Sequence, residues 1–210
     1  MRTDELIRTL ALDAGPVPAR PVAPRLLAVA LAGAVLWLAL LAVQFGPPAR
    51  SANAGWFWMK AVYSLLLAAA GLMATVRLAR PGGRIGAVIW LAVATVAWLL
   101  MMAGHETMNA SPGQMAHLWL GETWRICPVR ILIIAAPLYG AVLWVMRRTA
   151  PTRLATAGAA AGLFAGAVAA AIYGLYCQET AAAFVVAWYS LGIAACAALG
   201  ALIGRYLLRW

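Results

Sequence analysis

Three cysteines are the residues of this chain best suited to redox chemistry. Cys127 and Cys177 lie at the ends of two consecutive long apolar segments. Two thiols can form a disulfide when their Cα atoms come within about 7 Å. We expect Arg125 to favour a thiolate at Cys127, and Glu179 to oppose one at Cys177. The spacing leaves two interpretations open: a static disulfide that ties two helix ends together, or a redox-responsive dithiol.

Residues 101–117 combine methionines with histidines ahead of Cys127. These side chains are Met101, Met102, His105, Met108, Met115 and His117. Soft ligands of these types can hold Cu(I) or a heavy metal. Their spacing matches no recognised metal motif, however, and methionine at a helix end usually packs against its neighbours. We therefore predict no metal and no other cofactor; the candidate ligands, if a metal bound, are Cys127, Cys177, His105 and His117.

Long apolar segments must position these side chains. Of the 210 residues, 65% are hydrophobic and 10% are charged, and the mean hydropathy is +0.87. Six apolar blocks, each of about 20 residues, can cross roughly 30 Å of hydrocarbon as helices. We place them at residues 26–45, 56–76, 85–104, 128–146, 154–176 and 181–204. The sequence therefore predicts an all-α membrane protein, a bundle of six transmembrane helices.

Basic residues indicate how this bundle is oriented. If both termini share one side, that side holds twelve of the 16 basic residues, and the other holds Arg50, Lys60, Arg125 and Arg130. The positive-inside rule then predicts a bacterial inner-membrane protein with both termini in the cytoplasm and the cysteine pair at the oxidising periplasmic face. Topology explains the net charge of +10 without a nucleic-acid partner. We expect Lys60 and Arg130 to extend outward to the interface.

Small residues recur at every fourth position in the last two blocks. They are Gly158, Gly162, Gly166, Ala170 and Gly174 in one block, and Gly192, Cys196, Gly200 and Gly204 in the other. This spacing lets helix backbones approach closely. We therefore expect a tight antiparallel hairpin, joined through residues 177–180, in which Cys196 packs as a small apolar side chain.

The first 15 residues predict a short amphipathic helix. Thr3 suits an N-cap, Asp4 and Glu5 suit the positive helix start, and Gly15 with Pro16 suits a stop. An apolar stripe is formed by Leu6, Ile7 and Leu10. Prolines 16, 18, 21 and 24 then predict an extended linker. Because the helix carries more acids than bases, we favour capture in the groove of a basic cytoplasmic protein over a solvated or membrane-resting tail.

Several stretches together resemble the NrsF-like membrane anti-sigma factors, a family named for a negative regulator of an extracytoplasmic-function sigma factor. The resemblance runs along most of the chain. It rests on TDELIRTLA at 3–11, WRICP at 124–128, the run from 150 to 179, Trp188, Tyr189, Gly192, and LLRW at 207–210.

The resemblance implies a two-part protein. Residues 1–25 would be a cytoplasmic sigma-binding helix and its Pro-rich linker, with Asp4, Glu5, Leu6, Ile7 and Leu10 contacting an extracytoplasmic-function sigma factor. Residues 26–210 would be a six-span sensor domain among membrane lipids. The family needs two outer cysteines, matched here by Cys127 and Cys177, to release sigma under oxidants such as singlet oxygen or hypochlorous acid, or under some heavy metals. A histidine often precedes the second cysteine in the family, where this chain has Tyr176, and that departure favours thiol oxidation over metal coordination.

Two other functions compete with this interpretation. A membrane thiol-disulfide oxidoreductase would ordinarily carry a C-x-x-C pair beside a second pair, whereas this chain has three cysteines and no such motif. A heavy-metal transporter would need ligands or acids within its spans, and the predicted blocks contain no acidic residue. We therefore predict a regulator rather than an enzyme, with no small-molecule substrate.

Overall fold

The computed structural model describes residues 3–13, 21–46, 55–149 and 151–209, and the regular elements within these ranges are all helices. Six helical segments are long and apolar enough to cross a membrane. They are α2 (Val22–Phe45), α3 (Gly55–Leu78), α4 (Gly86–Met108), α6 (Cys127–Met146), α7 (Leu154–Gly174) and the composite segment α8 (Ala182–Phe184), η2 (Val185–Tyr189) and α9 (Ser190–Leu207). The all-α class and the six apolar helices are confirmed.

Two helices extend beyond their predicted boundaries, and the extensions include Pro24 and Glu106. Helix α2 begins at Val22, so Pro24 lies in its first turn and not in an extended linker; proline is tolerated there because its missing N–H would be unpaired anyway. Helix α4 continues to Met108, so Glu106 lies in its last turn. The expectation that the spans carry no acidic residue was therefore wrong for α4.

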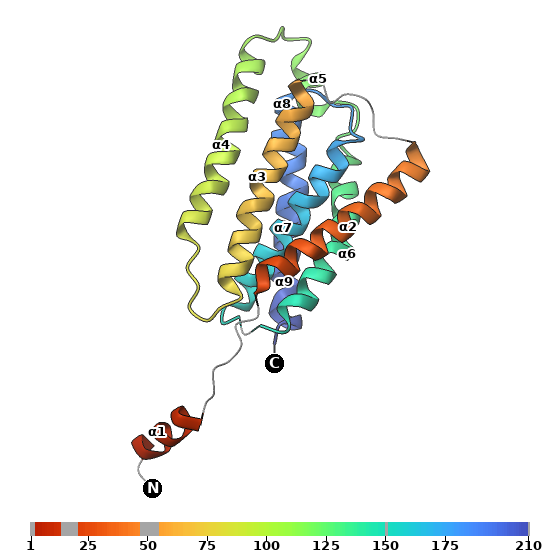
Figure 1. Cartoon of the computed structure of the whole chain (residues 1–210). Coiled ribbons are helices and arrows are strands. Elements are labelled where there is room, and N and C mark those ends of the chain that lie inside the picture. The colour runs from red at the N-terminus through yellow and green to blue at the C-terminus, as the bar shows by residue number, and fades with distance from the viewer. Residues whose placement is uncertain (1–2, 14–20, 47–54, 150, 210) are drawn as a thin grey trace.

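Helix α7 lies at the centre of the bundle and packs against α9, α3, α6 and α2 (Figure 1). Its composition explains this position, because a helix built from alanine and glycine lets several neighbours approach its backbone. Helix α2, by contrast, buries few residues and crosses the outside of the bundle.

The predicted hairpin of α7 and α9 is confirmed. A side chain at Gly162 would overlap the carbonyl oxygen of Cys196, and one at Gly158 would overlap the carbonyl oxygen of Gly200. Cys196 is 7% exposed and packs beside Gly166, as expected for a small apolar residue. The two backbones are in contact along these rows, so the glycines are required for the approach.

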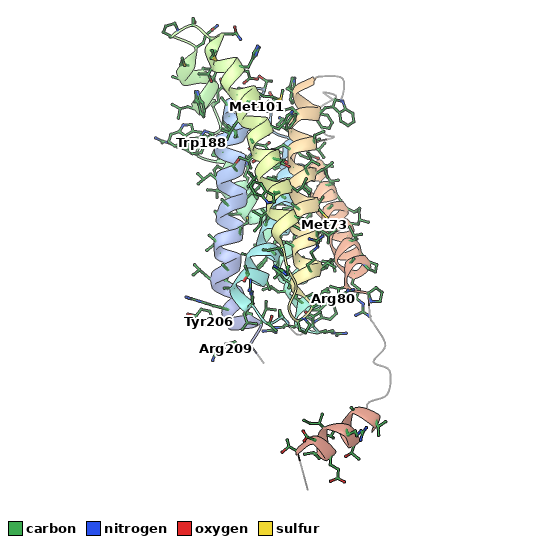
Figure 2. The ribbon with its side chains drawn as sticks, turned by 90° about the vertical axis from the view of Figure 1, so that its left-hand side faces the viewer. Met73, Arg80, Met101, Trp188, Tyr206 and Arg209 are labelled. Atoms are coloured by element: carbon green, nitrogen blue, oxygen red, sulfur yellow. The ribbon has the colours of Figure 1, made fainter. Side chains whose placement is uncertain are left out.

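The bundle has two chemically different ends. Because consecutive helices alternate in direction, one end carries nine described arginines: Arg25, Arg77, Arg80, Arg84, Arg147, Arg148, Arg153, Arg205 and Arg209. We call it the arginine end; Figure 2 shows Arg80 and Arg209 there. The opposite end, which we call the cysteine end, carries the short helix α5 (Met115–Leu120) and the segment 175–181.

The N-terminal helix α1 (Thr3–Asp13) lies apart from the bundle, beyond the arginine end in Figure 1. It starts at Thr3, the residue expected as its cap, and Thr9 donates a hydrogen bond to the carbonyl oxygen of Glu5. The predicted stop at Gly15 and Pro16 lies outside the described residues.

Candidate functional site

The two cysteines of the predicted pair meet at the cysteine end. Cys127 is the first residue of α6 and is fully buried, while Cys177 follows α7 and is 5% exposed. Both are free thiols in the structure, and they lie close enough to interact electrostatically. The structure therefore brings Cys127 and Cys177, which are distant in the chain, together as a pair of free thiols.

Lys60 is the cation of this site, and the prediction that it extends outward was wrong. It is 1% exposed, and its Nζ donates to the carbonyl oxygens of Cys177 at 2.7 Å and Glu179 at 2.9 Å. The ammonium also lies 4.4 Å from the centre of the Trp56 ring. A buried charge must be hydrogen-bonded to be tolerated, and these two carbonyl groups satisfy that need. Lys60 thus fixes the backbone that carries Cys177.

Lys60 also replaces the cation that the sequence suggested for the thiols. The charged groups near Cys127 are Lys60, Arg130 and Glu179. Arg125 is exposed and stacks on the Trp124 ring at 4.8 Å. The expected influence of Arg125 on Cys127 is therefore not found, because its side chain turns to an aromatic neighbour.

Glu179 connects the segment 175–181 to the turn that precedes α6 through hydrogen bonds. Its Oε1 accepts hydrogen bonds from the backbone N–H of Glu122 at 2.9 Å, from the N–H of Thr123 at 3.0 Å and from the Thr123 hydroxyl at 2.9 Å. Gly121 sits against this carboxylate with φ of +54°, and a Cβ there would lie 2.5 Å from Glu179 Oε2. Glycine is therefore required at this turn for both conformation and space.

Glu106 on α4 hydrogen-bonds to the residues that directly follow the segment 175–181. Its Oε2 accepts hydrogen bonds from the N–H groups of Ala182 at 2.7 Å and Ala183 at 3.4 Å. These groups open the last membrane-length segment, where free N–H groups favour a carboxylate. Together with Lys60 and Glu179, this contact links the segment 175–181 to α3, α4 and the start of α6.

Two tyrosines complete what we call the thiol cluster, defined as Cys127, Cys177, Lys60, Tyr173 and Tyr189. The rings of Tyr173 and Tyr189 are 6.0 Å apart. The fully buried Tyr189 hydroxyl interacts with Cys177 and has no partner of standard hydrogen-bond geometry among the described residues. Tyr189 ends the π-helical turn η2, an irregularity that is often found at functional sites.

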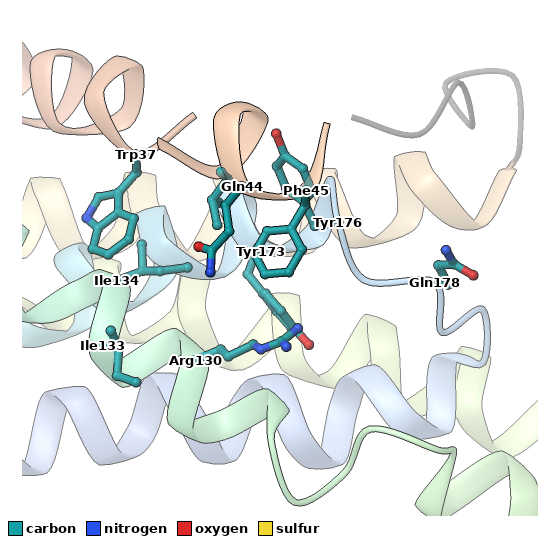
Figure 3. Close-up of a pocket in the computed structure, with 10 residues that line it drawn as sticks. Trp37, Gln44, Phe45, Arg130, Ile133, Ile134, Tyr173, Tyr176 and Gln178 are labelled. Carbon is teal, nitrogen blue, oxygen red and sulfur yellow. The ribbon is translucent and has the colours of Figure 1, made fainter. Parts of the chain in front are cut away.

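A cleft of about 500 Å³ opens beside the thiol cluster, between α2, α6 and α7 (Figure 3). Its polar wall includes Arg130, whose guanidinium carbon lies 5.7 Å from the Phe45 ring centre and 5.9 Å from that of Tyr173. Trp37, Leu41, Ile133 and Ile134 contribute the apolar lining. Arg130 is exposed, as predicted, but it faces this cleft.

The candidate metal ligands are not gathered into a site. Among the described residues no group of three or more His, Cys, Asp or Glu side chains is arranged to hold a metal ion. His105 lies 3.4 Å from the Asn109 side-chain amide, and His117 belongs to α5. Met101 and Met108 are 69% and 88% exposed.

The predicted partner-binding residues all lie on α1. Asp4 and Glu5 occupy its first turn, and the apolar stripe is exposed, with Leu6 at 41%, Ile7 at 60% and Leu10 at 62%. These apolar side chains have no covering surface among the described residues.

Sequence reasoning missed the hydrogen-bonding roles of three residues of the cysteine end: Lys60, Glu106 and Glu179. A signal was available for Lys60, because a charged residue within an apolar span is functional or structural by default. No such signal existed for the two glutamates, since their partners are backbone groups of distant segments.

The fold and the cysteine end together define a class: a bundle with six helices long and apolar enough to cross a membrane, a buried dithiol at one end and a separate exposed helix beyond the other. The chain belongs to the NrsF family, whose model, described as "Negative regulator of sigma F", matches residues 10–210.

Two curated relatives match along their whole length and along the whole of this chain. The "Anti-sigma-F factor NrsF" of Caulobacter vibrioides (strain NA1000 / CB15N) is 44% identical over 218 aligned positions, and the "Probable anti-sigma-F factor NrsF" of Azospira oryzae (strain ATCC BAA-33 / DSM 13638 / PS) is 40% identical over 218. No solved structure matches the chain. The relatives are named as regulators, so the family is not one of enzymes.

Proposed function

We propose that this chain is an anti-sigma factor of the bacterial inner membrane, which holds an extracytoplasmic-function sigma factor away from RNA polymerase. The observation that carries the proposal is the 44% identity, over the full length of both chains, to a protein named as an anti-sigma-F factor. Six helices of membrane-spanning length support the membrane location.

The orientation follows from charge. Both described ends of the chain approach the arginine end, and a bias of arginine marks the cytoplasmic side of bacterial membrane proteins. In the proposed orientation α1 lies in the cytoplasm and the thiol cluster lies at the periplasmic face. Sigma factors act in the cytoplasm, so α1 lies on the side where its partner is found.

Helix α1 is the sigma-binding element in this proposal. Its exposed stripe of Leu6, Ile7 and Leu10 would fill an apolar groove, and Asp4 and Glu5 would pair with basic residues at the groove edge. An 11-residue helix is only marginally stable alone, so partner binding would also stabilise it.

The thiol cluster is the proposed sensor. Hypochlorous acid would convert one thiol to a sulfenyl chloride with release of water, and the second thiol would displace chloride to close the Cys127–Cys177 disulfide with release of a proton. Both sulfur atoms are oxidised and the chlorine is reduced to chloride. Closure would pull on the segment 175–181, which is tied to α3 by Lys60, to α4 by Glu106 and to the α6 start by Glu179.

In this proposal, these contacts transmit the effect of disulfide closure to the helices that extend toward the cytoplasm. Helix α6 begins at Cys127, helix α7 ends at Gly174 shortly before Cys177, and the two helices pack together and extend to the arginine end. To release most of the bound sigma, the reduced and oxidised states must differ in affinity by a few kcal/mol, roughly two decades in binding constant.

Co-purification from membranes tests the proposal. We expect the intact protein to retain a sigma factor, identified by mass spectrometry, and a deletion of residues 1–15 to lose it. A more specific test compares two substitutions. Ile7→Asp places a charge within the apolar stripe, and the control Thr9→Asp adds the same charge to α1 outside the stripe. Loss of sigma with both substitutions, or retention after the deletion, would contradict α1 as the binding element.

The sensor is tested in the same preparation by adding hypochlorous acid. We expect oxidant to release sigma from the intact protein and from Cys196→Ala, a control thiol in the α7–α9 interface. The Cys127→Ser/Cys177→Ser variant should retain it. Equal release from that double variant would show that these thiols are not the sensor.

A further inference from the structure

The cleft beside Arg130 differs from the other grooves on the membrane-facing side of the bundle. The groove between α2, α3 and α7 is lined by apolar side chains such as Leu27, Leu31 and Phe164, and such grooves are filled by ordinary hydrocarbon chains. The Arg130 cleft instead joins polar groups to an apolar wall (Figure 3). Its lining therefore suits an amphiphilic ligand, with a polar head and a hydrocarbon tail.

Charge indicates the chemistry of the head. Arg130 forms no ion pair with a carboxylate among the described residues; its guanidinium carbon lies 5.7 Å from the Phe45 ring centre and 5.9 Å from that of Tyr173. The nearby acids are engaged elsewhere, since Glu179 and Glu106 accept hydrogen bonds from backbone N–H groups. A guanidinium has five N–H donors and prefers bidentate anions such as phosphate.

Polar groups beside Arg130 could share the same anion. Gln44 turns its side-chain amide toward the guanidinium in Figure 3. The Tyr173 side chain reaches the same guanidinium from α7 (Figure 3). Tyr176 also lines the cleft, but its hydroxyl points away from Arg130 in this view.

The apolar wall suits the tail. Trp37 and Leu41 on α2 face Ile133 and Ile134 on α6, and the cleft volume of about 500 Å³ lies within the range of about 300–1,000 Å³ common for ligand sites. Helix α2, which forms one wall of the cleft, is the least buried of the six apolar helices. A lipid beside α2 would therefore lie next to the cleft.

We propose that this cleft binds an anionic phospholipid of the leaflet at the cysteine end. The phosphate group lies on Arg130, Tyr173 and Gln44, and one acyl chain runs along the wall of Trp37, Leu41, Ile133 and Ile134. The site is separate from sigma capture by α1 and does not depend on it.

Native mass spectrometry of the full chain, purified in a neutral detergent and depleted of lipid, tests this site. Phosphatidylglycerol is titrated against phosphatidylcholine, which carries a phosphate but no net charge, and against inorganic phosphate as a competitor. The variants are Arg130→Gln and Arg130→Lys, and Arg125→Gln is the matched control, since Arg125 lies near the same end and stacks on Trp124.

We expect phosphatidylglycerol to bind the intact protein and Arg125→Gln equally, and Arg130→Gln about tenfold more weakly, as for the loss of one charge-assisted contact. Arg130→Lys should fall between them, because lysine keeps the charge but not the bidentate geometry. Unchanged binding to Arg130→Gln, or equal binding of both lipids, would overturn the proposal. Displacement of the lipid by millimolar inorganic phosphate would also overturn it and assign the cleft to a free anion.

Discussion

Replacing Lys60 with methionine removes a buried charge while keeping a similar length and volume. In the structure its Nζ donates hydrogen bonds to the carbonyl oxygens of Cys177 and Glu179 at 2.7 and 2.9 Å. Methionine cannot donate to either group. We expect the segment 177–179 to open more often, while the rest of the bundle keeps its stability.

The magnitude follows from opposing terms. Each buried carbonyl left without a donor costs about 1–3 kcal/mol. Removing the ammonium also removes the cost of burying it, which offsets part of this loss. A net local loss of about 2 kcal/mol corresponds to an opening equilibrium about 30-fold larger, since about 1.4 kcal/mol is a factor of ten.

Amide hydrogen exchange, followed by mass spectrometry in detergent, measures this opening. The Cys177 N–H is a suitable reporter, because it donates to the carbonyl oxygen of Tyr173 at 3.0 Å and exchanges only after that bond breaks. Peptides around Cys196 in the α7–α9 interface serve as the internal control. Unchanged exchange at Cys177, or equal acceleration around Cys196, would refute the role of Lys60 as a local anchor.

Two further substitutions test the packing and the cysteine end. Gly162→Leu should lower the thermal midpoint strongly, because the new side chain overlaps the α9 backbone, whereas Gly140→Leu, where nothing lies within 4 Å of a Cβ, should leave it nearly unchanged; similar midpoints for both would contradict the close contact. Glu179→Ala should speed amide exchange at Thr123 by about tenfold or more, as charged hydrogen bonds contribute about 1.5–3 kcal/mol. The control Glu122→Ala removes an exposed side chain and should not change the exchange rate at Thr123. An equal effect of both substitutions would argue against the Glu179 contact.

The sequence by itself determined the helical framework. Apolar runs of membrane-spanning length have no other way to pair their backbone groups in hydrocarbon, so the six helices follow from composition and length. The glycine rows likewise specified the α7–α9 hairpin, because the short connection forces the helices to be antiparallel neighbours and small residues allow contact. Helix α1 lies where the sequence predicts a short helix, whereas its capping and its partner-binding face stay predictions.

Only the tertiary structure decided what surrounds the cysteines. Whether Lys60 points to the interface or into the bundle depends on which helices pack against α3, and local sequence does not contain that information. Glu179 bonds to backbone groups 57 and 56 residues away, and Glu106 to groups 76 and 77 residues away. In each contact the partner of the carboxylate is a backbone N–H group, which nearly every residue has. The pattern of residue types therefore cannot predict which group the carboxylate will bind. These contacts form because packing buries Lys60 and partly buries Glu106 and Glu179, so that these charged groups are stabilised by partners within the chain.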